Sequence, residues 1–298
     1  MLRRRRLRSA VLGAAPERIL SPGEPPLRSV EGRIVDASPH LLVLRYGVRE
    51  LRMPMSEKTL VWYGGRAGLG ELLRGRDVVV RPTGDGLAAD RIWVDIVRVS
   101  GTIIRAEKDV VEVDQGPHRP RTRVVIPRQN QSQILVRHPR MEPGQLFDVI
   151  GRSSRHGVVA VKPGTAQPGD IAPPPARPGG SVVRGTATWF SGAGRGAAYP
   201  RVDRWGDAGG CADAPQPCAP VPFLSVGSAM KVRNDCTRRS ADVIVLECGC
   251  AGARFCDRCV ECGTSPRGRI IELTPASFVD LGGDLADGCF NVTVAVGG

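Results

Sequence analysis

The sequence predicts an all-β protein built from several small barrels. Apolar segments of four to six residues recur about every ten residues, a spacing typical of short antiparallel strands. The 298 residues include 37 Gly and 25 Pro, which supply the turns that such strands need. Aromatic residues make up only 4% of the chain, so the cores must be built mainly from Val, Leu, Ile and Ala.

Two segments repeat each other at an offset of 69 residues, and they define two predicted barrels, residues 28–98 and 99–162. Each opens with a strand that contains a glycine, Gly32 or Gly101, and its third strand ends in proline. Five strands in about 70 residues are typical of an OB-like barrel. The strands are expected at 30–37, 41–44, 51–54, 75–80 and 90–94, and again at 99–106, 110–113, 124–127, 144–150 and 157–161.

The aromatic residues are unevenly divided between the two repeats. Tyr46, Trp62, Tyr63 and Trp93 lie in the first, and only Phe147 lies in the second. OB barrels that bind single-stranded nucleic acid stack bases on exposed rings. A stacking platform would need such rings in both repeats, so we expect these side chains to fill cores and turns. Nucleic-acid binding by this half of the chain is therefore an alternative that the pattern disfavours.

The positive charge is confined to the first 181 residues. Residues 182–298 hold twelve of the 42 Lys and Arg and twelve of the 30 Asp and Glu, so 30 basic and 18 acidic residues remain for 1–181. A basic half can attract nucleic acid, anionic lipid or an anionic surface polymer. Only four of the 42 basic residues are Lys, and this Arg bias also follows from a GC-rich genome.

Two further segments flank the repeats. Residues 1–27 are predicted to be a basic tail or a degraded export signal, because an Arg-rich start precedes a short, weakly apolar stretch. The Pro-rich residues 163–181 are typical of an extended, semi-rigid linker. No run of 18 apolar residues occurs, so we predict no transmembrane helix.

All nine cysteines follow the linker, and five of them fall between Cys248 and Cys262. This segregation indicates a distinct domain, 182–298, that is either stapled by disulfides or clipped by a metal. The four thiols of Cys248, Cys250, Cys256 and Cys259 could form a tetrahedral zinc site, but their two pairs are closer together than in zinc ribbons. Disulfides are favoured, and the candidates are Cys211, Cys218, Cys236, Cys248, Cys250, Cys256, Cys259, Cys262 and Cys289.

Four blocks follow one another in the last domain: Gly185-Thr-Ala-Thr-Trp-Phe190, Pro222 to Asn234, Gly268-Arg-Ile-Ile-Glu-Leu-Thr-Pro-Ala-Ser-Phe278 and a Val-rich final strand. In this order they resemble the double-psi β-barrel of the rare lipoprotein A group, which is related to expansins and barwin-like proteins, and the resemblance covers residues 182–298. In the last long block, Thr274 and Pro275 are expected to cap and begin a helix that ends near Leu281.

The resemblance implies contact with cell-wall glycan, and in some members its cleavage by an Asp and a His. Here the His position falls at Val221 or Pro222, and the loop that carries the Asp is replaced by the cysteine-rich residues 248–266. Carboxylates that could still supply acid/base catalysis are Glu272, Glu247 and Asp257. Trp189 and Phe190 are the candidate glycan-binding residues.

The sequence thus predicts an exported protein, extracellular or in the cell envelope, whose last domain binds cell-wall glycan or peptidoglycan or serves a structural surface role. One alternative is a peptidoglycan lytic transglycosylase, and the other is nucleic-acid binding by the basic half. No cofactor is expected apart from the structural zinc that the cysteines allow.

Overall fold

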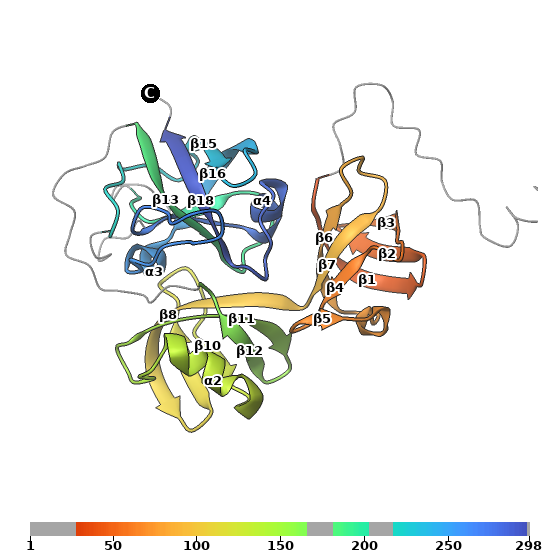
Figure 1. The fold of residues 1–298 in the computed structure, drawn as a ribbon, viewed down its shortest axis with the longest axis horizontal. Coiled ribbons are helices and arrows are strands. Elements are labelled where there is room, and N and C mark those ends of the chain that lie inside the picture. Colours follow the sequence, from red (N-terminus) through yellow and green to blue (C-terminus); the bar gives the residue numbers. More distant parts are fainter. Residues whose placement is uncertain (1–27, 166–180, 203–216, 297–298) are drawn as a thin grey trace, which may run out of the picture.

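A computed structural model describes residues 28–165, 181–202 and 217–296, and it is built from three β-sheets (Figure 1). Two of the sheets close into barrels of five and six strands, and the third is open. The predicted all-β fold is confirmed. The predicted tail, nearly all of the predicted linker and Cys211 lie outside the described residues. In the part that is described, no helix is long and apolar enough to cross a membrane.

The first sheet has seven strands in the order β3-β2-β1-β6-β7-β4-β5. Its elements are β1 (Val30–Ser38), β2 (Leu41–Tyr46), β3 (Arg49–Pro54), β4 (Leu60–Trp62), β5 (Arg66–Ala67), a 3₁₀ turn η1 (Leu69–Glu71), β6 (Asp77–Pro82) and β7 (Ala89–Val94). A closed five-stranded barrel is predicted here, but the sheet is open. The cause is β4, which pairs with the edge of β7 and leaves β3 as an edge strand.

The second sheet is the closed five-stranded barrel that the repeat predicts, and it carries one helix. Its elements are β8 (Ile96–Glu107), β9 (Val110–Asp114), β10 (Thr122–Val125), α2 (Arg128–Arg137), β11 (Leu146–Ser154) and β12 (Gly157–Pro163). The barrel closes where β10 pairs in parallel with β12. We call these residues the second barrel.

The strand order shows that the first sheet and the second barrel share one plan. The series β3-β2-β1-β6-β7 in the first matches β10-β9-β8-β11-β12 in the second. The repeated glycines have the same role in both: a Cβ on Gly32 would lie 2.7 Å from the Arg45 carbonyl oxygen, and a Cβ on Gly101 would lie 2.0 Å from that of Asp114. Only glycine allows the next strand to come this close.

The third sheet is a closed six-stranded barrel in the order β13-β17-β14-β16-β15-β18. We call it the third barrel. Its elements are β13 (Val182–Trp189), β14 (Ala197–Tyr199), β15 (Ala229–Asn234), β16 (Ser240–Cys248), α3 (Cys250–Ala253), β17 (Arg269–Leu273), α4 (Pro275–Asp280) and β18 (Cys289–Val296). Two of its strand pairs are parallel, β13 with β17 and β14 with β16. As predicted, the Thr274 side chain caps α4, and Pro275 begins it.

The three sheets pack against one another, with the third barrel lying over β8 and β11 of the second (Figure 1). The first sheet also touches the third barrel directly. The Ser29 hydroxyl donates to Asp280 at 2.6 Å, and the Trp93 indole N–H donates to Asp284 at 3.3 Å. These contacts hold together segments that are about 190 to 250 residues apart in the sequence.

Candidate functional site

A row of residues crosses four adjacent strands of the third barrel and brings two of the predicted carboxylates together. Ala198 on β14 is paired with Glu247 on β16 and with Glu272 on β17, and Glu272 is in turn paired with Thr188 on β13. Paired residues on neighbouring strands project from the same face of a sheet. Ala198 carries only a methyl group, so it leaves room between the two carboxylates. We call these four residues the carboxylate row.

The carboxylate row lies on the outer face of the barrel. The residues that alternate with it, Ala197, Tyr199, Ile271 and Leu273, belong to the hydrophobic core. The second barrel and α3 cover the row from outside: the Ser100 hydroxyl donates to Glu272 at 3.3 Å, and a Cβ on Gly252 would lie 2.9 Å from the Glu272 carboxyl carbon. As a result only 2% of the Glu272 side chain is exposed, against 24% for Glu247.

Arg119 of the second barrel occupies the space between the two carboxylates. Its Nε donates to Glu247 at 2.8 Å, and its terminal nitrogen donates to Glu272 at 3.1 Å. The guanidinium also stacks on the Phe190 ring, 4.2 Å from the ring centroid. A guanidinium that bridges two carboxylates and lies on an aromatic ring combines the main contacts for which arginine is suited.

The loop that carries Arg119 is residues 115–121, between β9 and β10. Gly116 has a φ of +100°, a backbone conformation that glycine adopts freely and that strains other residues. The Gly116 N–H donates to the Asp114 carboxylate at 2.9 Å, and the Gln115 amide donates to the Pro120 carbonyl at 3.2 Å. The loop therefore has a defined shape although it contains no helix or strand.

One polar atom of the carboxylate row has no partner. Thr188 is fully buried at 0% exposure, and its hydroxyl makes no hydrogen bond to any residue that the structure describes. An unmade hydrogen bond in a buried site costs about 1–3 kcal/mol, so such a group calls for an explanation. Its place beside Glu272 makes it a polar group that a ligand in the row could reach.

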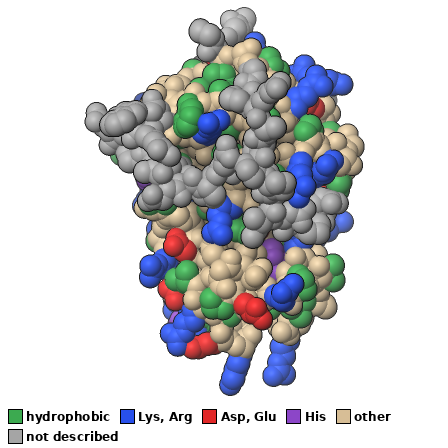
Figure 2. Space-filling view, turned by 90° about the vertical axis from the view of Figure 1, so that its left-hand side faces the viewer, with side chains coloured by type: hydrophobic (Ala, Val, Ile, Leu, Met, Phe, Trp, Pro, Cys, Tyr) green, Lys and Arg blue, Asp and Glu red, His purple; other side chains and the backbone are tan. Residues whose placement is uncertain are grey.

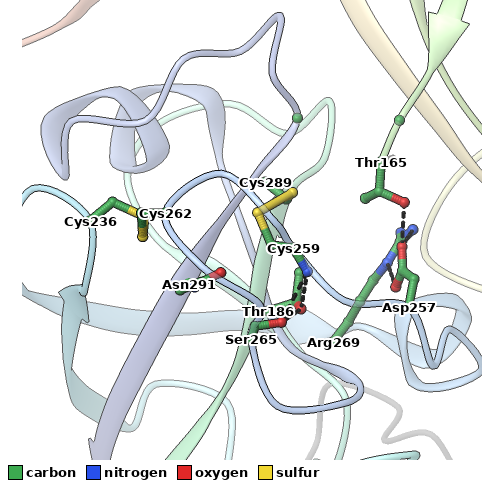
Figure 3. Close-up of a disulfide and its surroundings, with 12 residues drawn as sticks. Thr165, Thr186, Cys236, Asp257, Cys259, Cys262, Ser265, Arg269, Cys289 and Asn291 are labelled. Carbon is green, nitrogen blue, oxygen red and sulfur yellow. Dashed lines mark hydrogen bonds and ion pairs between the residues drawn. A yellow bond between two sulfur atoms is a disulfide. The ribbon is translucent and has the colours of Figure 1, made fainter. Parts of the chain in front are cut away.

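The third predicted carboxylate, Asp257, does not join the row. Its side chain is fully buried, and both oxygens accept hydrogen bonds from Arg269 at 2.9 Å (Figure 3). Thr165, at the end of the second barrel, also donates to it. A carboxylate enclosed in this way cannot reach a substrate, and its role is to hold the two barrels together.

Asp148 and Arg98 extend the Asp257 contact into a buried ionic cluster. Arg98 donates to Asp148 at 2.9 and 2.8 Å, and Arg269 donates to the same carboxylate from the third barrel. Burial by itself would raise the Asp148 pKa, but the positive charges of Arg269 and Arg98 outweigh it and lower that pKa well below its ordinary value. Asp148 is therefore ionised at neutral pH.

The charges on the two sides of this interface are complementary. Three arginines and one aspartate of the second barrel meet three carboxylates and one arginine of the third, so formal charges of +2 and −2 face each other. The residues are Arg98, Arg119, Arg137 and Asp148 on one side, and Glu247, Asp257, Arg269 and Glu272 on the other. Complementary charge fixes the orientation in which two surfaces meet.

His138 gives the interface an expected dependence on pH. It follows α2, its Nε2 lies 3.0 Å from the Asp148 carbonyl oxygen, and burial lowers its pKa. Because the folded pKa lies below the unfolded value of about 6.5, the unfolded chain takes up the proton first, and stability is lost as the pH falls below that value. We expect the unfolding free energy to fall by up to about 1.4 kcal/mol per pH unit between pH 6.5 and 5.

Urea denaturation at pH 7 and pH 5 measures this loss, and the variant His138→Gln isolates the contribution of the imidazole. In that variant the stability difference between the two pH values should shrink, because no imidazole remains to be protonated. His156→Gln is the matched control, since His156 is exposed on the same barrel. An equal pH dependence in wild type and His138→Gln would contradict the prediction.

The described cysteines are all oxidised. The disulfides are Cys218–Cys256, Cys236–Cys262 and Cys259–Cys289, and Cys248 and Cys250 are also disulfide-bonded. Each of the three pairs fastens the 248–266 segment to a different part of the third barrel, and Figure 3 shows two of them. Cys256 and Cys259, which the zinc alternative places in one site, belong to different disulfides, so the structure gives that alternative no thiolates.

The two predicted glycan-binding residues are not exposed. Trp189 is fully buried in the core, and its indole N–H donates to the Leu285 carbonyl at 3.0 Å. Phe190 is buried beneath Arg119, where it supports the site without facing solvent. The residues that sequence reasoning missed are Arg119, Ser100 and Thr188.

No protein-family model matches the chain, and no curated protein matches its sequence.

Proposed function

We propose that this chain is an exported protein of the cell envelope whose third barrel binds cell-wall glycan at the carboxylate row without cleaving it. Sugars are bound by planar carboxylates and hydroxyl groups that accept and donate hydrogen bonds, and the row offers both in Glu247, Glu272 and Thr188. The residues of the row come from four strands of a rigid barrel, which suits a preorganised binding face.

Two observations support export and the choice of ligand. Disulfides persist in oxidising compartments, and every cysteine that the structure describes is oxidised. The third barrel is a closed β-barrel, and a β-barrel is what the resemblance to the rare lipoprotein A group implies for this segment. Glycan as the ligand follows from that resemblance together with the polar row.

The ion pairs of Arg119 with Glu247 and Glu272 are the reason for proposing that the glycan is bound without being cleaved. Acid/base cleavage of a glycosidic bond needs a carboxyl group that is free to reach the glycosidic oxygen. Here Arg119 engages both carboxylates of the row, and Glu272 is covered by the second barrel. The lytic transglycosylase alternative would need this arrangement to open.

Sedimentation with purified peptidoglycan sacculi tests binding and cleavage together. We expect the full-length protein to pellet with the sacculi and to release no anhydro-muropeptides. Glu272→Gln should weaken binding roughly tenfold, because a charged hydrogen-bond partner is lost. Glu261→Gln is the matched control, since Glu261 is exposed and outside the row. Anhydro-muropeptides that disappear in Glu272→Gln would instead establish the enzyme, and a protein that stays in the supernatant would contradict glycan binding.

Nucleic-acid binding by the first two sheets gains no support from the aromatic side chains. Trp62, Trp93 and Phe147 are buried, and the guanidinium groups of Arg76 and Arg152 both lie near the Tyr63 ring. Tyr46 is half exposed, contrary to expectation, but a single ring is no stacking platform. Figure 2 shows the side of the second and third barrels, where the visible Lys and Arg side chains of described residues lie scattered among other residues.

A further inference from the structure

Arg119 occupies the carboxylate row in the way that a bound ligand would. It belongs to another barrel, it enters through a loop, and its only charged contacts that the structure describes are with Glu247 and Glu272. Its guanidinium lies on the Phe190 ring, as a ligand cation lies on an aromatic surface. The Glu247 end of the row is partly exposed and the Glu272 end is closed, so a competing ligand would enter past Glu247.

The charge of the row restricts what can replace Arg119. Without it, two carboxylates would face each other across Ala198, one of them almost fully buried. Neutral hydroxyl groups compensate a buried carboxylate less well than a cation does, because a desolvated charge is best balanced by a partner of opposite sign. A protonated primary amine supplies that charge and three N–H donors. The Thr188 hydroxyl, which bonds no residue that the structure describes, lies next to Glu272, where a neighbouring hydroxyl of the same ligand can bond it.

We propose that Arg119 holds the place of a ligand amine, and that the carboxylate row selects glycans whose amino sugars carry a free, protonated amine over those whose amines are acetylated. The inference rests on the proposed function and specifies its ligand class. On binding, the ammonium group of the ligand replaces the Arg119 guanidinium between the two carboxylates, and the 115–121 loop moves aside. The net charge of the row and its partner therefore stays the same. Arg119 is then an internal competitor, and its removal should strengthen binding.

The direct test compares two oligosaccharides of equal length, one of glucosamine and one of N-acetylglucosamine, by calorimetric titration of the full-length protein at a pH where the amines are protonated. We expect the glucosamine oligomer to bind at least ten times more tightly. Arg119→Met, which keeps an unbranched side chain over Phe190 but removes the charge, should tighten that binding several-fold. Arg121→Met, an exposed neighbour in the same loop, should leave it unchanged.

Labelling of carboxylates with a carbodiimide and an amine, mapped by mass spectrometry, tests the place of Arg119 without relying on glycan binding. Glu272 should be protected in the wild type, labelled in Arg119→Met, and protected again when the glucosamine oligomer is added. Asp148 should stay unlabelled throughout, which shows that the interface between the barrels is intact. If Arg119→Met fails to fold, Arg119→Lys should give intermediate labelling, because lysine keeps the charge without the fork.

The possible outcomes separate this inference from the proposed function. Equal affinity for the two oligomers overturns the inference and leaves glycan binding standing. Binding of neither oligomer by a protein that still pellets with sacculi also overturns it. Equal labelling of Glu272 in the wild type and in Arg119→Met would show that Arg119 does not shield Glu272, and it would overturn the inference whatever the glycan results. Failure to pellet with sacculi, with Glu272 protected only when Arg119 is present, counts against the proposed function alone.

Discussion

Full reduction of the disulfides should unfold the third barrel. Each of the three pairs closes a loop of 26 to 38 residues. A cross-link of that span stabilises a folded chain by about 3–4 kcal/mol through the entropy that it removes from the unfolded state. Three together contribute about 10 kcal/mol, which is comparable with the whole stability of an ordinary domain. Apart from α3 and the last residue of β16, the segment 248–266 contains no helix or strand longer than an isolated bridge, so side-chain contacts such as that of Asp257 with Arg269 are what else holds it.

Hydrogen exchange with and without reductant, read by mass spectrometry, measures this effect. Amides of β13 to β18 should lose their protection, whereas β8 and β11 of the second barrel should keep most of theirs, because the first 210 residues contain no cysteine. The second barrel is thus the internal control. Retained protection in β17 after alkylation has proved complete reduction would show that packing alone holds the third barrel.

Arg269→Met should lower the free energy of unfolding by about 3–5 kcal/mol, the usual cost of removing one partner from a buried ion pair. Arg269 donates to Asp257 and to Asp148, so the variant leaves two buried carboxylates without one of their cations. Arg258→Met is the matched control, since Arg258 is exposed one residue from Asp257. Urea denaturation at pH 7 measures both variants.

The effect of Arg269→Met should also depend on pH. The Asp148 pKa is lowered in the folded protein, so its stabilising contribution is complete above the unfolded value of about 3.9 and is lost as the pH falls through the folded value. The difference in stability between wild type and variant should therefore shrink below about pH 4. A difference that stays constant down to pH 3, or one below 1 kcal/mol at pH 7, would contradict the assigned role of the cluster.

Local chemistry explains why much of the fold could be predicted. In both repeats the apolar residues of the strands alternate, and a glycine stands where the neighbouring strand comes close. Both signals depend only on residues near one another in the sequence. Thr274 and Pro275 are a further example, because an N-cap and a first-turn proline work on their own helix. Helix α2 was missed for the same reason, since Ile134 is its only buried residue and it has no capping side chain.

The site could be predicted only in part, because its key contacts cross between barrels. The sequence could name Glu247 and Glu272 as candidates, but it could not show that they lie on either side of Ala198. The placement of Asp257 depends on Thr165 of another barrel and on Arg269, which also contacts Asp148 of that barrel. The burial of Trp189 could not be foreseen, because a motif does not reveal which face of its strand is covered. For Arg119 there was one usable sign: the second repeat has seven residues, 115–121, where the first has only Gly47 and Val48.

Because the β2–β3 turn is five residues shorter than the β9–β10 loop, one part of this chain can serve to replace another. The shared strand order of the first sheet and the second barrel is what an internal duplication would leave, with one copy keeping a minimal hairpin and the other an extended arm. The short turn already joins the equivalent strands, β2 and β3, in this same chain. Grafting Gly47–Val48 in place of 115–121 should therefore give a chimaera whose barrel still closes and whose carboxylates stand open.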